Sequence, residues 1–167
     1  MEIRIAGTVQ DSIVDGPGLR YVVFVQGCPH CCAGCHNPQT HDFSGGRLTD
    51  TDALFDECVE NPLTMGVTFS GGEPFSQAEA LYELGTRLKQ RGYNLMCYSG
   101  WTFEELLKKA ETDEFVGKLL GILDTLVDGR FELSRRSLTL KFRGTTNQRI
   151  LDVKKSLAAH NAIEAEC

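Results

Sequence analysis

The chain alternates short apolar runs with segments whose apolar residues recur at helical spacing. The apolar runs are rich in β-branched and aromatic residues, which is typical of buried strands. They cover residues 21–25, 66–70, 93–98 and 122–127. Helical periodicity is found in residues 77–90, 102–109 and 147–160. This alternation predicts an α/β fold with a parallel sheet and right-handed crossovers.

Chain length limits the architecture. The 167 residues fit a single domain spanning 1–167. A closed barrel of eight parallel strands typically needs about 250 residues, so we expect an incomplete parallel (β/α) barrel. Thr102 and Glu105 have the spacing of a capping box, which predicts where one helix begins.

Unusual residues follow each predicted strand. In a parallel sheet the carboxyl ends of the strands meet at one edge, where function usually sits. The segments after the four strands are Gly27-Cys28, Gly71-Gly72-Glu73-Pro74, Ser99-Gly100 and Asp128-Gly129. We therefore expect the active site at this edge.

Composition and charge limit which partners the protein can bind and in which cellular compartment we expect it. With 41% hydrophobic residues the chain can bury a core, and its net charge of −6 argues against a nucleic-acid partner. No apolar run approaches the roughly 18–20 residues of a membrane helix. The first residues also lack the apolar stretch of a signal peptide. We expect a cytoplasmic protein with no membrane partner.

Four of the seven cysteines fall within eight residues, at Cys28, Cys31, Cys32 and Cys35. An odd cysteine number without an export signal argues against disulfides and favours metal. All four could hold zinc, although the adjacent Cys31 and Cys32 would strain a loop closed on one ion. Alternatively, a C-x3-C-x2-C set of Cys28, Cys32 and Cys35 could hold three irons of a [4Fe–4S] cluster and leave the fourth open. The role of Cys31 stays open.

The second motif is Ser70-Gly71-Gly72-Glu73-Pro74, at the end of the second predicted strand. Paired glycines allow the backbone to approach a ligand closely. Exposed main-chain groups together with the Glu73 carboxylate could bind an ammonium group. An ordinary strand-to-helix turn is the simpler interpretation of this motif alone.

The two motifs together resemble the radical S-adenosylmethionine superfamily. The resemblance implies a [4Fe–4S] cluster whose open iron chelates the amino and carboxylate groups of S-adenosylmethionine. An electron from the reduced cluster then gives methionine and a 5′-deoxyadenosyl radical. It implies a radical-SAM-type barrel and no catalytic side chain beyond the cluster and cofactor ligands. The implied metal ligands are Cys28, Cys32 and Cys35, and the implied cofactor contacts are Gly34, Cys35, His36, Gly71, Gly72 and Glu73.

The sequence departs from the superfamily pattern at one position that bears on adenine binding. The superfamily usually has an aromatic residue just before the third cysteine, whereas this chain has Gly34 there, followed by His36 after the cysteine. Adenine packing would then fall to other side chains, such as His36.

The closer resemblance is to the branch that activates the anaerobic ribonucleotide reductase. Residues 12–20, with their Asp-Gly-Pro-Gly-x-Arg stretch, resemble glycyl-radical activases generally, and residues 126–131 and 140–150 resemble the reductase activases more selectively. This implies hydrogen abstraction from a glycine of the anaerobic (class III) ribonucleoside-triphosphate reductase as protein substrate. By the same analogy, flavodoxin or ferredoxin supplies the electron.

Several alternatives remain. The first is activation of another glycyl-radical enzyme such as pyruvate formate-lyase, and the second is a small-molecule radical enzyme. Outside catalysis, an electron-carrying ferredoxin-like module or a zinc-stabilised interaction domain would also use clustered cysteines.

The other notable residues have simpler interpretations. We expect Asp128 and Arg143 at the active edge without assigned roles. Cys58 and Cys97 are expected in the core, Cys167 on a terminal tail, Trp101 in packing, and His41 and His160 at the surface.

Overall fold

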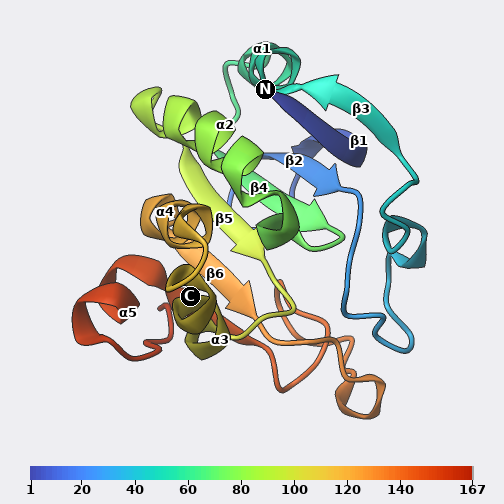
Figure 1. Ribbon diagram of the computed structural model, residues 1–167, viewed down its shortest axis with the longest axis vertical. Helices are drawn as coiled ribbons and strands as arrows, with labels where there is room; N and C mark the ends of the chain where they lie inside the picture. Colours follow the sequence, from blue (N-terminus) through green and yellow to red (C-terminus); the bar gives the residue numbers. More distant parts are fainter. Residues whose placement is uncertain (167) are drawn as a thin grey trace.

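A computed structural model describes residues 1–166 and shows one seven-stranded sheet with helices packed against it (Figure 1). The strand order is β3-β1-β2-β4-β5-β6-β7. The strands are β1 (Glu2–Ser12), β2 (Arg20–Val25), β3 (Arg47–Asp50), β4 (Gly66–Gly71), β5 (Asn94–Tyr98), β6 (Thr125–Asp128) and β7 (Arg149–Asp152). The helices are α1 (Thr51–Val59), α2 (Ala78–Gln90), α3 (Phe103–Ala110), α4 (Glu114–Ile122) and α5 (Val153–Ala159).

The centre of the sheet is parallel and its margins are antiparallel. Strands β2, β4, β5 and β6 run parallel, as the sequence predicts. Strands β1 and β3 add antiparallel pairs on one side, and β7 adds one on the other. The predicted parallel sheet is therefore confirmed for the four central strands, and antiparallel strands that the sequence did not predict make the sheet mixed at both margins.

The predicted helix 147–160 is correct only in its second half. Residues 149–152 form β7 against β6, and α5 begins at Val153. Asp152 explains the boundary because its side chain accepts a hydrogen bond from the Lys155 amide and so caps the helix. Similarly, the fourth predicted strand begins too early, since α4 extends to Ile122 and β6 begins at Thr125.

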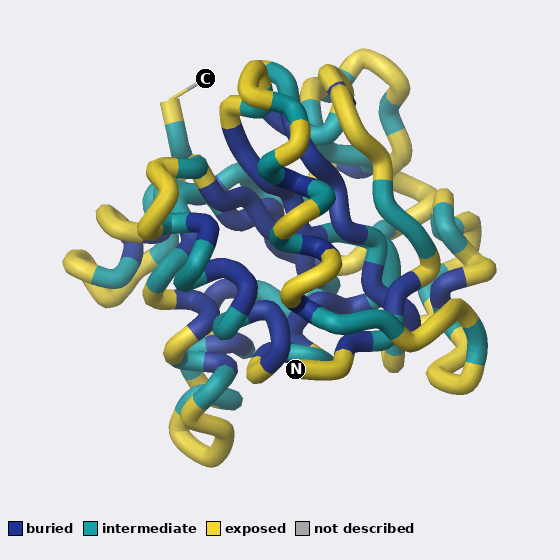
Figure 2. Tube along the Cα trace, turned by 90° about the horizontal axis from the view of Figure 1, so that it is seen from above, coloured by how far each residue is buried: buried dark blue, intermediate teal, exposed yellow. Residues whose placement is uncertain are grey.

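The helices cover one face of the sheet and enclose the core. Helices α1, α2 and α4 pack in a row, and α3 and α5 both contact α4. Between them and the sheet lie Phe69, Leu95 and Leu126 from the strands and Leu81 and Leu84 from α2, all at most 1% exposed. Figure 2 shows these buried segments surrounded by exposed loops. Cys58 and Cys97 lie in this core, as predicted.

Loops cover the opposite face. The Asp-Gly-Pro-Gly stretch joins β1 to β2 and is held by Arg20, whose side chain is 1% exposed. Its guanidinium donates to Thr68 Oγ1 (2.8 Å), to the Pro17 carbonyl (3.0 Å) and to Asn94 Oδ1 (2.9 Å). Burial lowers the pKa of Arg20 to about 10. One buried cation thus ties this loop to β4 and β5.

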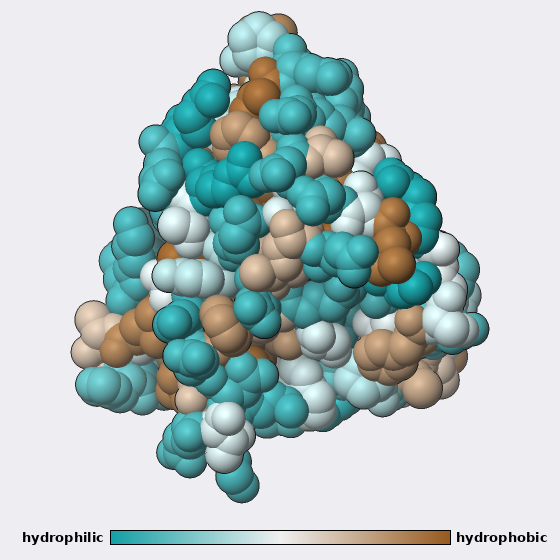
Figure 3. All heavy atoms as spheres, turned by 45° about the horizontal axis from the view of Figure 1, so that its top comes forward, coloured by the Kyte–Doolittle hydropathy of each residue, from teal (hydrophilic) through white to brown (hydrophobic). Residues whose placement is uncertain are grey.

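The outer surface is mostly hydrophilic, with separate hydrophobic patches on the face that Figure 3 shows. Within residues 1–166, no helix combines the length and the apolar character that a bilayer crossing requires. Cys167 lies outside the described residues.

Candidate active site

The predicted cysteines lie in a loop closed at its base, which we call the cysteine loop (residues 26–41). Gly27 N donates to the Thr40 carbonyl (2.7 Å), and Cys28 N donates to the His41 carbonyl (3.2 Å). The Gln26 side chain, buried at 3% exposure, donates to the Gln39 and Asp42 carbonyls. These bonds join the two ends of the loop directly beyond β2.

Three of the four clustered cysteines face one small cavity. Cys28, Cys32 and Cys35 are half-buried and line a space of about 110 Å³, whereas Cys31 is exposed and does not line it. The ends of the other parallel strands reach the same cavity, through Gly71 and Gly72 after β4, Ser99 and Gly100 after β5, and Gly129 after β6. The predicted edge of the sheet therefore does bring these segments together.

The donor set suits a cluster better than a single ion. Within residues 1–166, no group of three or more His, Cys, Asp or Glu side chains is arranged to hold one metal ion. Zinc bound by four cysteines would require every sulfur within about 2.3 Å of one point. Three thiols that line one cavity are the type of donor that an iron–sulfur cluster uses.

A further observation supports a bound group here. Burial raises the pKa of Cys28 to about 11 and also raises the pKa of Cys32, so both thiols favour the protonated form and would have to release their protons to become ligands. His41 lines the same cavity, and its Nε2 is buried without a hydrogen-bond partner among residues 1–166. His41 as a whole is partly exposed, so the expectation of a surface residue holds only in part, because its Nε2 is buried toward the cavity. A sulfur-rich group in the cavity would give this nitrogen a partner.

Glu73 is fully buried and its carboxylate is occupied by protein donors. It accepts hydrogen bonds from Ser99 Oγ (2.9 Å), the Gly100 amide (2.8 Å) and the Phe75 amide (3.0 Å). His30 Nε2 lies 2.7 Å from Oε1, with 4% of the His30 side chain exposed. The Glu73 side chain thus links the cysteine loop to the ends of β4 and β5, while Ser70 and Gly71 of the same motif line a neighbouring cavity.

Gly72 is a point of close backbone packing. A Cβ atom there would lie 2.4 Å from the Gly27 carbonyl oxygen and 3.0 Å from the Thr40 carbonyl oxygen. The missing side chain therefore admits the cysteine loop. A substitution at Gly72 would displace that loop first, and would not simply fill the space of a ligand.

A larger cavity of about 500 Å³ lies beside the first and shares Cys35 with it. It is lined by Cys35, His36, Gly71, Tyr98 and Arg143, among others. Phe131 also lines it, and its ring centroid is 5.0 Å from that of His36. The cavity combines several aromatic rings, glycine backbone, one cation at Arg143 and one carboxylate at Asp15, a combination that suits a nucleoside carrying charged groups of both signs.

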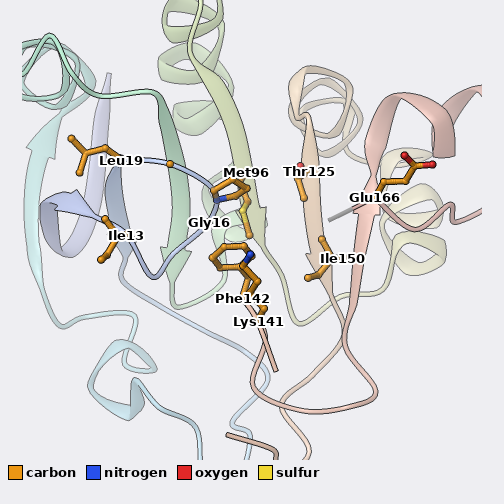
Figure 4. A pocket seen from close by; sticks show the side chains of 12 residues that line it. Ile13, Gly16, Leu19, Met96, Thr125, Lys141, Phe142, Ile150 and Glu166 are labelled. Carbon is orange, nitrogen blue, oxygen red and sulfur yellow. The ribbon is translucent and has the colours of Figure 1, made fainter. Parts of the chain in front are cut away.

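A third cavity of about 690 Å³ lies against the same face of the sheet. Figure 4 shows Met96, Gly16 and Phe142 close together, with Thr125 and Ile150 on one side of them and Ile13 and Leu19 on the other. Phe142 lines this cavity and also the 500 Å³ cavity, so the two are neighbours. The Tyr98 hydroxyl holds that position by donating to the Phe142 carbonyl (2.6 Å).

Asp128 and Arg143 both reach the active edge, but in different ways. Arg143 lines the 500 Å³ cavity, and its Nη1 donates to the Gln148 carbonyl. Asp128 is 1% exposed and is occupied by the Phe103 amide (2.7 Å) and by Arg149 (2.5 Å). Asp128 thus fixes the base of residues 129–148, which we call the C-terminal loop.

Sequence reasoning did not single out His30, Phe131 or Phe142. His30 lies within the cysteine motif, where its position two residues after Cys28 is a signal that could have been weighed. Phe131 and Phe142 belong to an irregular loop without periodicity, so no pattern places their rings. Trp101 packs edge-on against His30 with centroids 4.6 Å apart, as its predicted packing role implies.

Comparisons with known proteins agree with this geometry. A family model described as "4Fe-4S single cluster domain" matches residues 14–151. The anaerobic ribonucleoside-triphosphate reductase-activating protein of Vibrio cholerae is 34% identical, with 81% of this chain and 89% of that protein covered. The pyruvate formate-lyase-activating enzyme of Clostridium pasteurianum is 35% identical, with 65% of this chain but only 49% of that enzyme covered.

One solved structure shares the fold. QueE from Escherichia coli superposes with a TM-score of 0.50 at 18% identity, covering 60% of this chain and 54% of that one. At this identity the likeness concerns the mixed α/β architecture alone. Family model and relatives together show that the chain belongs to the 4Fe-4S single cluster domain family and, within it, to the anaerobic ribonucleoside-triphosphate reductase-activating proteins.

Proposed function

We propose that this chain is a radical S-adenosylmethionine enzyme that activates an anaerobic ribonucleoside-triphosphate reductase by generating a glycyl radical on it. The observation that carries the proposal is the convergence of Cys28, Cys32 and Cys35 with the ends of all four parallel strands around one cavity. We further propose that residues 1–167 act as one domain in the cytoplasm, with the open sheet as an incomplete barrel.

The three cysteines would hold a [4Fe–4S] cluster, and Cys31, exposed and outside the cavity, would not. When bound, this cluster supplies the electron for reductive cleavage of S-adenosylmethionine. The fixed base of the cysteine loop keeps the three sulfurs in place, so the ligand positions are preorganised.

S-adenosylmethionine would occupy the 500 Å³ cavity beside Cys35. The backbone of Gly71 and Gly72 would face its amino group, and Arg143 would balance the carboxylate. The rings of His36 and Phe131 would pack against adenine, which compensates for Gly34 where an aromatic residue is usual. Glu73 would not contact the cofactor through its side chain but would hold the glycine motif in position through its hydrogen bonds to Ser99 and Gly100.

The neighbouring 690 Å³ cavity supports a protein substrate. It opens beside the cofactor cavity and is lined mainly by apolar residues such as Ile13, Leu19 and Ile150. A peptide segment entering here would reach the cofactor past Phe142. Hydrogen abstraction from a glycine Cα requires such access for a flexible loop of the partner.

The test is anaerobic reconstitution, reduction with dithionite, and addition of S-adenosylmethionine and the cognate reductase. We expect release of 5′-deoxyadenosine and a doublet in electron paramagnetic resonance that disappears when the partner glycine is replaced by alanine. Exposure to oxygen should cleave the partner at that glycine. A radical on pyruvate formate-lyase but not on the reductase would instead assign the chain to that enzyme.

A further inference from the structure

Positive charge is concentrated in one part of an otherwise acidic chain. Residues 130–149 contain six of the 17 Lys and Arg residues but only one of the 23 Asp and Glu residues. This segment includes most of the C-terminal loop beside the cofactor cavities. A local field of opposite sign to the net charge is typical of a surface that attracts a charged partner.

The start of this segment packs against the cysteine loop. A Cβ on Gly34 would lie 2.8 Å from Leu133 Cδ1, so the leucine side chain sits directly on that glycine. Phe131 packs on His36 on the same side. Figure 1 shows the blue cysteine loop and the orange C-terminal loop side by side. The arginines next to these contacts therefore lie near the candidate cluster.

Three of these arginines are accessible, and we call them the basic surface: Arg130, Arg135 and Arg136. The Arg130 and Arg135 side chains are 42% and 52% exposed, and Arg136 is also exposed. Arg135 has only a distant ion pair, 4.0 Å from Glu132, and Arg136 has none within residues 1–166. Arg130 pairs with the partly exposed Glu105 at 3.2 Å. Most of this charge is thus available to a partner.

We propose that the basic surface docks an acidic one-electron carrier protein. This inference rests on the proposed function, in which the cluster accepts one electron and the carrier is oxidised by one electron. The carrier must approach the cysteine loop closely, and Arg135 and Arg136 are exposed residues that directly follow the Phe131 and Leu133 contacts with that loop. The 690 Å³ cavity assigned to the protein substrate is lined by other residues. Transient redox complexes bury little area and rely on electrostatic steering.

The test compares two charge reversals of equal size. Arg135→Glu/Arg136→Glu changes the basic surface, and Lys154→Glu/Lys155→Glu changes two exposed residues of α5 at the opposite edge of the sheet. Reduced flavodoxin is the probe, and stopped-flow absorbance follows reduction of the cluster. Binding of oxidised flavodoxin to the same proteins is measured by calorimetry. Dithionite, a small reductant that needs no docking, is the internal control.

We expect the arginine variant to be reduced by flavodoxin on the order of tenfold more slowly at low salt and to bind it more weakly. The deficit should shrink as ionic strength rises, because salt screens exposed charges. Reduction by dithionite should be unchanged, as should all rates of the lysine variant. Equal losses in both variants, or none in either, would overturn the proposal.

A different result would show that the basic surface binds the reductase and not the electron carrier. If dithionite-reduced arginine variant formed less glycyl radical on the reductase while flavodoxin reduced it normally, the surface would belong to the protein substrate and the proposal would be wrong. If the proposed function itself were wrong, no reductant would yield 5′-deoxyadenosine, even from the parent protein.

Discussion

The cysteine loop and the C-terminal loop border the same cavities, but they are anchored differently. The cysteine loop is tied along its length, through Gln26 and Gly27 at its base and through His30 to the buried Glu73. The C-terminal loop is closed at its base by the ion pair of Asp128 and Arg149 and is held at one interior point by the Tyr98 hydrogen bond to Phe142, while residues 132–136 are exposed. The first arrangement fixes geometry for chemistry, whereas the second leaves a surface on which partners can be distinguished.

The largest effect should come from the cysteines themselves. Cys28→Ser, Cys32→Ser and Cys35→Ser should each lose the cluster and all radical formation, because each removes a thiol that lines the cavity. The parent should hold about four irons per chain. Cys31→Ser is the matched control and should retain them, since Cys31 is exposed. Iron analysis after anaerobic reconstitution measures the cluster content of each variant. Cluster loss in Cys31→Ser with retention in Cys32→Ser would refute the ligand assignment.

The next largest effect should come from Glu73→Gln, which removes the charge that joins the two motif loops. An amide can accept only on one oxygen, so buried donors from His30, Ser99 and Gly100 would compete for it. We expect a loss of about 3 kcal/mol in the free energy of unfolding. Urea denaturation of the metal-free protein measures it. Glu79→Gln, at an exposed position of α2, should cost under about 0.5 kcal/mol, and equal losses would show that the buried network contributes little.

Gly72→Ala tests the close contact between the same two loops. Its methyl group would meet the Gly27 and Thr40 carbonyls, so the cysteine loop must move. We expect about 1–3 kcal/mol of destabilisation together with reduced iron content. Gly7→Ala is the control, because a Cβ there meets nothing within 4 Å. Full iron loading of Gly72→Ala at parental stability would contradict the role of this contact.

The smallest effect should come from the C-terminal loop. Tyr98→Phe removes one hydrogen bond to the Phe142 carbonyl and should cost about 1 kcal/mol. It should raise the KM for the protein substrate more than it changes cluster content, since Phe142 separates the two larger cavities. Tyr82→Phe is a control whose hydroxyl has no hydrogen-bond partner within residues 1–166. A loss of cluster in Tyr98→Phe would mean that this loop, too, shapes the metal site.

The two loops also differ in how far the sequence predicts them. The cysteine spacing and the glycines at strand ends identify the active edge, because the order of a parallel sheet brings those ends together. The capping box of Thr102 and Glu105 likewise sets the start of α3. Strand β7 could not be predicted, since its four residues follow the same apolar spacing as α5 and pair only because β6 offers an edge. The burial of His41 Nε2 depends on tertiary packing that no local pattern records.

Arg20 also constrains how the molecule folds. Its guanidinium contacts groups on β4 and β5, 47 and 74 residues further along the chain at Val67 and Asn94. The Asp-Gly-Pro-Gly loop therefore cannot settle until β5 has joined the sheet, and parallel pairings of this separation form slowly. The wall of the substrate cavity is consequently a late product of folding. Pulsed hydrogen exchange should show the Met65 amide, which donates to the Leu19 carbonyl (2.8 Å), gaining protection after the amides of β4, and the reverse order would disprove this sequence of events.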